Sequence, residues 1–349
     1  MESPLTYPLK LSVIVPVLNE SAHIERMAAT LLALDSTPKE VLLTDGGSAD
    51  DTRERIRSLA AQNPDVRLVE NPDRYVSQGF NRAYRVARGE YVALVGAHAE
   101  YPEHYFERCI AAIESGRCDA CGGFLIQRGK TPMGCAIAHA MSSRFGVGDT
   151  AFRTTPVERY VDSVAFAVYS RRIFERCGLM DEELVRNQDD EFHYRLNAAG
   201  FRMLMLPDLR VAYFVRNTLS ALWRQYEGYG FYKPLVIAKV RSGLRLRHLV
   251  PSAFVLYLLS LPAAFLTALW AIPLALYALL AVWFSRGLGL GFWRGPAAFV
   301  VLHVAYGWGF WRGLWYWRAR FGIPLNPRSA KKKRLNPDPP KKQDPRNAG

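Results

Sequence analysis

The chain has 349 residues, of which 50% are apolar and 22% charged, and its formal net charge is +13. This length is enough for one large domain or two ordinary ones, each with its own core. Residues 318–349 carry ten Lys/Arg against two Asp, so most of the excess charge lies in one tail. Because that tail is Pro-rich and follows apolar sequence, we expect a disordered arm on anionic lipid, which excludes nucleic acid as its partner.

The start of the chain predicts its compartment. Its short apolar run, LKLSVIVPVL, has no basic region before it and leads straight into Asn19-Glu20, unlike a signal peptide. Five cysteines, an odd number without framework spacing, suit a reducing compartment. We therefore expect the first part of the chain to be cytosolic.

Strands and helices alternate over the first hundred residues. Residues 11–17 (LSVIVPV) form an apolar, β-branched run, as expected of a strand buried on both faces. Further strands are predicted over 40–44, 66–69 and 90–95, and helices over 20–34, 51–61 and 77–87. This alternation predicts right-handed βαβ units and a doubly wound, mostly parallel α/β sheet, whose ligands bind at the carboxyl ends of the strands.

The segments that follow these strands carry ligand-type residues. PVLNE (16–20) follows the first strand, DGGSADDT (45–52) the second and GAH (96–98) the fourth. Asp45 is placed to accept hydrogen bonds from a base or a ribose, and Gly46-Gly47 lets the backbone turn tightly against a ligand; a well-capped turn without a ligand is the alternative. The chain has no G-x-G-x-x-G after the first strand and no Walker lysine, which argues against NAD enzymes and P-loop NTPases.

A second polar cluster, Asp189-Asp190-Glu191, begins a predicted helix that ends near Gly200. Acids at a helix N-terminus are favoured by the dipole, so a structural cap is one interpretation. Three acids are more than a cap needs, and a carboxylate anchored at a helix start is also a suitable general base for an incoming hydroxyl.

The last third of the chain is membrane-like. Residues 249–284 are 36 residues without a charge, about 54 Å as a helix against about 30 Å of hydrocarbon, which predicts a hairpin of two short helices broken at Pro262 or Pro273. A further apolar segment covers 295–317. A hairpin and a third span would make three crossings, which would place the tail on the opposite side of the membrane from the domain. Because we expect both to be cytosolic, either one segment is interfacial or re-entrant, or the long run crosses once with tilt. We predict a cytosolic domain over 1–240, membrane-associated helices over 241–320 and a basic tail over 321–349.

Four motifs together resemble one family. VIVPVLNE, DGGSADDT, GAHAEYP and QDDEFHYRL occur in the order and at about the spacing of family-2 glycosyltransferases with the GT-A fold. The stretches VDSVAFAVYSRRIFERCGLMDEELVRNQDDEFHYRL and HVAYGWGF resemble, more narrowly, bacterial succinoglycan-type exopolysaccharide glycosyltransferases. The resemblance covers roughly residues 9–320 and implies a GT-A-type sheet followed by C-terminal transmembrane or interfacial helices.

The resemblance implies roles for individual residues. The catalytic base that deprotonates the acceptor hydroxyl falls on Asp189, with Asp190 and Glu191 as further acids, while Gln188 stands where a glutamate is usual. Arg224 and Gln225 correspond in part to a Gln-x-x-Arg-Trp segment near the donor phosphates, although Gly228 stands where an arginine is expected. The positions that line the nucleotide-sugar pocket are Pro16, Asn19, Glu20, Asp45, Gly46, Gly47, Ser48 and Asp51.

The implied reaction is inverting sugar transfer, in which the nucleoside diphosphate leaves with negative charge. In this family Mn²⁺ or Mg²⁺, held by an Asp-x-Asp motif, usually offsets that charge. Here Gly96 replaces an expected Asp, so the cation site is altered. His98 is the candidate metal ligand, Glu100 is a substitute, and the diphosphate itself is a third holder of the ion.

The expected function is a glycosyltransferase on the cytosolic face of the cytoplasmic membrane, which moves a sugar from a nucleotide sugar, expected to be a UDP-sugar, to a polyprenyl-linked or glycan acceptor in exopolysaccharide synthesis. An enzyme of the dolichyl-phosphate-mannose-synthase kind, acting directly on a polyprenyl phosphate, is a further enzymatic alternative. A catalytically degenerate scaffold or binding subunit of a polysaccharide assembly complex is the alternative from another class, and Gly96 is the feature that favours it.

Overall fold

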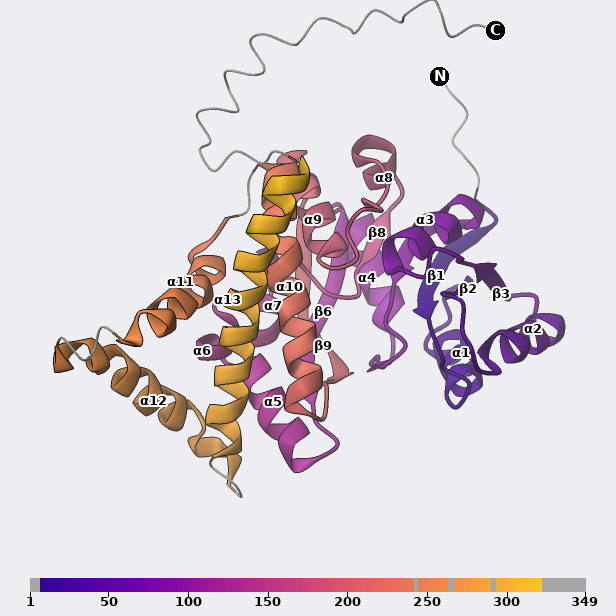
Figure 1. Cartoon of the computed structure of the whole chain (residues 1–349). Helices are drawn as coiled ribbons and strands as arrows, with labels where there is room; N and C mark the ends of the chain where they lie inside the picture. Colours follow the sequence, from indigo (N-terminus) through magenta and orange to yellow (C-terminus); the bar gives the residue numbers. More distant parts are fainter. Residues whose placement is uncertain (1–6, 242–243, 263–266, 290–292, 322–349) are drawn as a thin grey trace, which may run out of the picture.

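The computed structural model describes residues 7–241, 244–262, 267–289 and 293–321. Its centre is a nine-stranded sheet in the order β3-β2-β1-β4-β8-β6-β9-β5, with β7 paired to β9 (Figure 1). The strands are β1 (Leu9–Val17), β2 (Lys39–Asp45), β3 (Val66–Glu70), β4 (Gly89–Leu94), β5 (Ala99–Glu100), β6 (Ala120–Arg128), β7 (Arg159–Val161), β8 (Val168–Ser170) and β9 (Met203–Phe214).

The first four strands are parallel and are connected by helices, as the sequence predicts. β1 pairs with β2 on one side and with β4 on the other, and it is buried on both faces: Val13 and Val15 enter one core cluster and Ile14 enters another. The connecting helices are α1 (Ile24–Ala33), α2 (Thr52–Gln62) and α3 (Val76–Val86). The predicted α/β class with a mostly parallel sheet is confirmed.

The second half of the sheet introduces one antiparallel strand. β8 lies between β4 and β6 and runs antiparallel to both, and β9 then runs parallel to β6. β9 therefore has the direction of β4. The helices of this half are α4 (Tyr105–Glu114), α5 (Pro132–Ser142), α6 (Arg144–Val147), α7 (Ala151–Thr154), α8 (Arg172–Cys177) and α9 (Gln188–Ala198).

This topology places the start of α9 at the ligand-binding edge. α9 leads into β9 through a short turn and runs back along the sheet, so its N-terminus lies at the edge where β9, β4, β1 and β2 end. The acids predicted at a helix start and the polar tips of the first strands thus share one edge of the sheet.

Two long helices pack side by side beside the sheet (Figure 1). They are α10 (Leu219–Val240) and α13 (Arg294–Phe321). A Cβ atom on Gly309 would overlap the Glu227 carbonyl oxygen, and one on Gly313 would overlap that of Phe231, so the two backbones are in direct contact. Glycines spaced four apart permit this close approach because they put no side chain between the helices. The apolar segment that suggests a membrane helix is thereby packed along α10.

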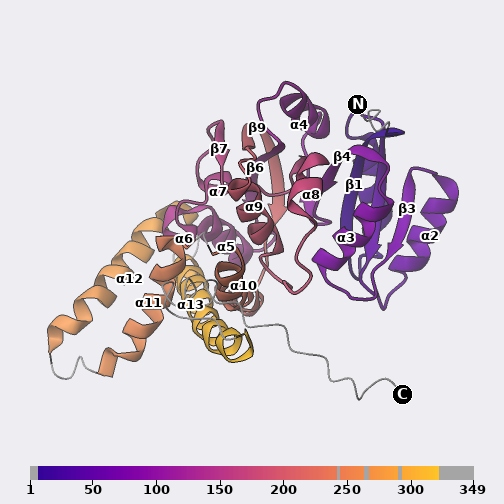
Figure 2. The ribbon, with the colours of Figure 1, turned by 90° about the horizontal axis from the view of Figure 1, so that it is seen from above.

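The remaining C-terminal helices form a hairpin that projects from the body (Figures 1 and 2). They are α11 (Leu246–Leu259) and α12 (Ile272–Phe284), with short 3₁₀ turns at 268–271 and 286–288. By length and composition alone, Ala268–Leu288 is the one described segment that could cross a membrane. Pro273 stands in the first turn of α12, where a missing N–H costs nothing. The basic tail predicted over 321–349 lies almost wholly outside the described residues.

Both ends of this hairpin are fixed to the chain at and just after α6. At the start of α11, the Arg247 guanidinium pairs with Asp149 at 2.7 Å. At the end of α12, the ring of Phe284 stacks on Phe145 with centroids 5.1 Å apart. The hairpin therefore leaves the body and returns to it.

The glycine contact between α10 and α13 predicts a difference between two Gly→Ala variants. Gly309→Ala should lower the free energy of unfolding by about 1–3 kcal/mol, because the added methyl group forces the helices apart. Gly228→Ala is the matched control: it is also in the helix pair, but its Cβ would lie 3.6 Å from the nearest atom, an ordinary contact. This variant should be neutral or more stable by up to about 1 kcal/mol. Equal melting temperatures for the two variants would contradict the packing.

Candidate active site

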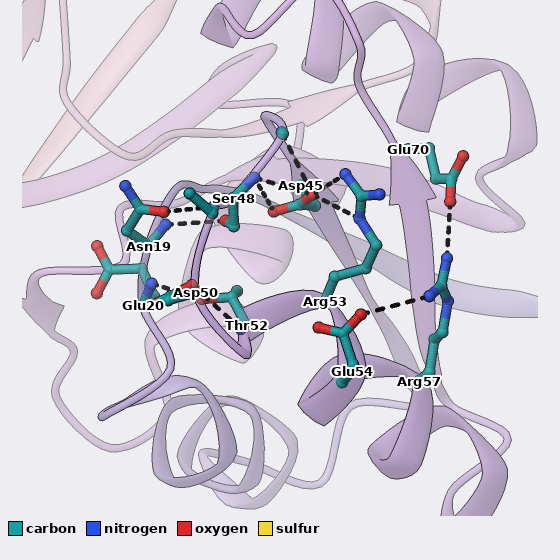
Figure 3. A network of polar contacts seen from close by, with 12 residues as sticks. Asn19, Glu20, Asp45, Ser48, Asp50, Thr52, Arg53, Glu54, Arg57 and Glu70 are labelled. Carbon is teal, nitrogen blue, oxygen red and sulfur yellow. Dashed lines mark hydrogen bonds and ion pairs between the residues drawn. The ribbon is translucent and has the colours of Figure 1, made fainter.

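The Asp45 carboxylate at the end of β2 orders the loop that follows it (Figure 3). It is 1% exposed. Its Oδ2 accepts hydrogen bonds from Arg53 Nη2 at 3.0 Å and from the Gly47 N–H at 3.3 Å, and its Oδ1 accepts from the Ser48 N–H at 3.2 Å. Gly47 has φ +78°, a backbone conformation that favours glycine. Because a carboxylate oxygen has two lone pairs, Oδ1 retains capacity for one more donor.

The tips of β1 and β2 are bonded to each other. The Asn19 N–H donates to Ser48 Oγ at 2.8 Å, and Asn19 Oδ1 accepts from the Ala49 N–H at 2.8 Å. The Glu20 N–H donates to Thr52 Oγ1, also at 2.8 Å. These bonds use the backbone of Glu20 and leave its carboxylate for other partners (Figure 3). Asn19 has φ +56°, a strained conformation of the kind that collects at functional sites.

The other predicted nucleotide-site residues have different local roles. Pro16 lies within β1, in register with Thr44 of β2. Gly46 lies against a neighbouring loop, because a Cβ there would be 2.8 Å from the Arg74 carbonyl oxygen. Asp51 is exposed and makes no capping bond to α2. The neighbouring Asp50 makes the loop contacts instead: it accepts from the Ser21 N–H and from the Thr52 hydroxyl.

Position 96, after β4, is filled by an aromatic ring from another loop. A Cβ on Gly96 would lie 2.7 Å from Cε1 of Phe166 and 3.0 Å from its Cζ. Phe166 itself has φ +54°, a rare conformation for a bulky residue, and its ring also packs edge-on against Tyr101 at 5.8 Å. A side chain at position 96 therefore requires Phe166 to move.

His98 lies against the tip of β1. Its Nε2 is 2.9 Å from Glu20 Oε1, so an imidazole and a carboxylate from two strand tips meet. Glu100, the predicted substitute ligand, is exposed in β5. Within the described part of the chain, no group of three His, Cys, Asp or Glu side chains is arranged to hold a metal ion.

The three acids at the start of α9 have different partners. Asp190 pairs with Lys233 of α10, whose side chain is 3% exposed, and Glu191 pairs with Arg195 at 2.7 Å. Burial alone would raise the pKa of Asp190, but the Lys233 ammonium outweighs burial and holds that pKa below its usual value. Asp189 is exposed and has no hydrogen bond or ion pair with any residue that the structure describes.

Asn187 holds this helix start in place. It has φ +60°, and its Nδ2 donates to the Tyr229 carbonyl oxygen of α10 at 2.8 Å. Together with the pair between Lys233 and Asp190, this bond fixes the first turn of α9 to α10. Sequence reasoning missed Asn187 and Lys233, because the contact joins elements about forty residues apart.

The two site residues predicted on α10, Arg224 and Gln225, lie in different surroundings. Arg224 is exposed, whereas Gln225 donates from Nε2 to the Tyr229 hydroxyl at 3.0 Å and keeps a buried Oε1 without a partner. At Gly228, where the resemblance leads us to expect an arginine, the side chain of Arg186 passes instead: Arg186 Cγ would be 3.6 Å from a Cβ on Gly228.

A cavity of about 970 Å³ begins at Asp189 and extends to the C-terminal helices. Its walls come from α6 and α7, the segment before α9, and helices α10 to α13. The strand-tip residues Asn19, Asp45 and His98 are not part of its lining. The edge of the sheet thus has two compartments, the strand tips and this cavity, and Asp189 belongs to the wall of the second.

Comparison with known proteins agrees with this geometry. Residues 12–178 match the profile of "Glycosyl transferase family 2". The chain is 32% identical to the succinoglycan biosynthesis protein ExoA of Rhizobium meliloti over 88% of this chain and 96% of that protein. It is 26% identical over 72% of its length, and 80% of the relative's, to a Methanococcus voltae enzyme named dolichyl N-acetyl-alpha-D-glucosaminyl phosphate 3-beta-D-2,3-diacetamido-2,3-dideoxy-beta-D-glucuronosyltransferase.

A solved structure shares the fold. It is the mannosyltransferase PcManGT from Pyrobaculum calidifontis in complex with GDP-Man and Mn²⁺, which superposes with a TM-score of 0.59 at 21% identity over 87% of this chain and 88% of that one. The predicted GT-A-type fold is confirmed, and the chain belongs to glycosyltransferase family 2.

Proposed function

We propose that this glycosyltransferase is attached to the cytoplasmic membrane, with its catalytic domain cytosolic. It transfers a sugar with inversion from a nucleotide sugar to a lipid-linked or polysaccharide acceptor in exopolysaccharide synthesis. The observation that carries the proposal is the unpaired Asp189 carboxylate, which lies at the carboxyl edge of the sheet and at the start of a large cavity. The names of the relatives agree, since one concerns succinoglycan and another a dolichyl-linked acceptor.

In this proposal Asp189 is the general base. It removes the proton from an acceptor hydroxyl as the oxygen attacks the anomeric carbon, and the nucleoside diphosphate leaves from the opposite face of the sugar. A base must be free to accept a proton, and Asp189 has no cationic partner among the described residues that would occupy its oxygens. Asp190 and Glu191, each paired with a cation, position the helix start that carries it.

The nucleotide is proposed to bind at the tips of β1 and β2. Asp45 Oδ1 has capacity for a donor from the base or ribose, and the bonds between Asn19, Ser48 and Ala49 keep the site ordered before the ligand arrives. A pre-ordered site avoids the entropy cost of arranging loops on binding. A UDP-sugar is the donor we propose to test first.

A divalent cation, Mn²⁺ or Mg²⁺, is the implied cofactor, and the residues present fit it at two positions. His98 and Glu20, whose Nε2 and Oε1 atoms are 2.9 Å apart, are the residues that would hold it. Imidazole suits Mn²⁺ better than Mg²⁺. When bound, the ion would offset negative charge on the leaving diphosphate, whose own oxygens complete the ligand set.

Membrane attachment is proposed for the α11–α12 hairpin. Its large exposed apolar side chains include Leu269, Leu276 and Leu279, which are 71%, 55% and 68% exposed. Apolar surface of this extent is unfavourable in water and is typical of a protein or membrane interface. Because both ends of the hairpin return to the body, the catalytic domain and the following chain remain on one side, and α13 need not cross.

The first prediction separates the roles of the adjacent acids. Asp189→Asn should lower transfer by about 10²–10⁴-fold, the usual contribution of a general base, and leave the melting temperature and UDP binding unchanged. Asp190→Asn should instead destabilise the protein by about 3–5 kcal/mol, because it leaves the buried Lys233 ammonium unpaired.

Two measurements test these effects. Sugar transfer to a lipid acceptor is measured with a panel of UDP- and GDP-sugars, and stability is measured by thermal unfolding. Full transfer by Asp189→Asn would refute the assignment of the base. A wild-type protein that consumes no donor in any combination would favour the scaffold role.

A second prediction concerns position 96. Gly96→Asp should lower both the melting temperature and turnover, because the new side chain collides with Phe166. The double variant Gly96→Asp, Phe166→Ala should regain most of the lost stability, since it removes the colliding ring. Turnover and unfolding of the two variants are compared over a range of Mn²⁺ concentrations. A Gly96→Asp variant with higher Mn²⁺-dependent turnover than wild type would show that the site lacks only its acid.

A third prediction tests the hairpin. The double variant Leu276→Glu, Leu279→Glu should abolish flotation with anionic phospholipid vesicles, because charged groups do not enter hydrocarbon without a large cost. Val157→Glu is the matched control: Val157 is 59% exposed on the catalytic domain, and its replacement should leave flotation unchanged. Equal flotation of the double variant and wild type would place the membrane contact elsewhere.

A further inference from the structure

The cavity next to Asp189 contains more positive than negative charge. Its wall carries the cations Arg144, Arg153, Arg186, Lys233, Arg245 and Arg247 and the carboxylates Asp149, Asp162, Asp189 and Asp190. Three of the cations are neutralised within the wall: Lys233 pairs with Asp190, Arg245 with Asp162 at 2.9 Å, and Arg247 with Asp149 at 2.7 Å. The three that remain, Arg144, Arg153 and Arg186, form no ion pair with a described residue.

Arg153 is the most constrained of these three. Its guanidinium carbon lies 5.2 Å from the centre of the Phe152 ring, and the phenols of Tyr226, Tyr229 and Tyr213 interact with it electrostatically. Its Nε is buried without a hydrogen-bond partner, and the buried hydroxyl of Tyr306 on the same cavity is also unpartnered. A desolvated guanidinium beside unmatched polar atoms indicates an anionic ligand that the chain does not itself provide.

Arg186 is held near the base by α10. It lies three residues before Asp189, and its side chain passes over Gly228, the α10 position without a side chain of its own. The Arg186 Cγ would lie 3.6 Å from a Cβ at that position, an ordinary contact. Arg153 and Arg186 thus bring two unpaired guanidinium groups to the cavity that begins at Asp189.

Part of the cavity wall is apolar. There the wall is made by Val250, Pro251 and Phe254 of α11, Tyr277 of α12 and Leu302 of α13. The same helices present apolar side chains to the outside, as described for the hairpin. A ligand that suits the whole cavity therefore has an anionic part near the hydroxyl to be activated and an apolar part toward the hairpin.

We propose that Arg153 and Arg186 form a phosphoryl-binding subsite that selects a prenyl phosphate- or diphosphate-linked acceptor over a neutral glycan. The inference rests on the proposed transferase function and decides between its two acceptor classes. Planar guanidinium groups bind phosphoryl oxygens in pairs of hydrogen bonds, and neither Arg153 nor Arg186 has an ion pair with a described carboxylate that would compete for those bonds. The strand tips proposed to receive the nucleotide do not line this cavity, so the proposal assigns the phosphoryl group to the acceptor, and UDP binding by the variants distinguishes it from the donor diphosphate.

The test is direct binding to the full-length protein in detergent, which needs no turnover. Farnesyl diphosphate, farnesol and UDP are titrated against wild type and against Arg153→Gln, Arg153→Lys and Arg186→Gln. Wild type should bind farnesyl diphosphate at least ten-fold more tightly than farnesol. Both Gln variants should lose at least ten-fold of that affinity and keep UDP binding within two-fold. Arg153→Lys, which retains the charge, should lose less than Arg153→Gln.

Arg85→Gln, at an exposed position on α3 remote from the cavity, is the matched control and should bind all three ligands as wild type does. Melting temperatures identify any variant that fails to fold, and the exposed Arg186 position keeps the test valid if Arg153 variants do not fold. Loss of UDP binding in the Gln variants would assign the arginines to the donor diphosphate and overturn the proposal. Equal binding of farnesyl diphosphate and farnesol by wild type would also overturn it.

These outcomes separate the subsite from the transferase function. Sugar transfer by wild type with unchanged farnesyl diphosphate binding in the arginine variants refutes the subsite and leaves the transferase standing. Arginine-dependent binding without sugar transfer from any donor supports the subsite and refutes the transferase proposal.

Discussion

The buried ion pair between Lys233 of α10 and Asp190 of α9 determines how the proposed catalytic base is presented. Two adjacent carboxylates at a helix start repel each other, and one of them would tend to take up a proton. Lys233 neutralises Asp190 and Arg195 neutralises Glu191, so the negative charge at Asp189 is not shared. A helix start with three acids becomes a site with one free carboxylate because the other two are bound to cations.

The same helix α10 connects this site to the apolar hairpin. On one side it holds α9 through Lys233 and the Tyr229 carbonyl oxygen; on the other its backbone touches α13 at Gly309 and Gly313. α13 in turn packs against α11. Helices in direct backbone contact move as one body because packed interfaces are not continuously deformable. If the hairpin is embedded in lipid, the depth of that embedding sets the height of Asp189 and of the cavity above the membrane surface.

The sequence predicts the first half of the fold well and the second half less completely. From Leu11 to Leu94, local periodicity and turn residues determine each element, and the predicted strands and helices agree with β1 to β4 and α1 to α3 within a few residues. The antiparallel β8 is short and pairs with strands distant in sequence, so no local pattern announces it. For the 295–317 segment, hydropathy reports the composition of the helix and does not identify the helices that pack against it, which are α10 and α11.

The site residues also divide into those that the local sequence identifies and those that depend on neighbours distant in sequence. Asp45, Asn19 and Asp189 could be named from the sequence because each stands at a recognisable position after a strand or at a helix start. Lys233, Arg153 and Arg186 could not, since their meaning depends on which charges lie next to them in space, and an arginine with a carboxylate partner looks the same in the sequence as one without.

Gly96 shows this limit most clearly. Compared position by position with its family, the chain lacks an acid there, which suggests a damaged cation site. In the structure the space belongs to Phe166, a bulky residue that adopts φ +54° to reach it, and conformations of this kind persist only where the surroundings enforce them. A lost acid would leave an empty position that tolerates a larger side chain. The tight fit of Phe166 against Gly96 means that an acid at this position would require Phe166 to move, a constraint that only the spatial arrangement of the two loops reveals.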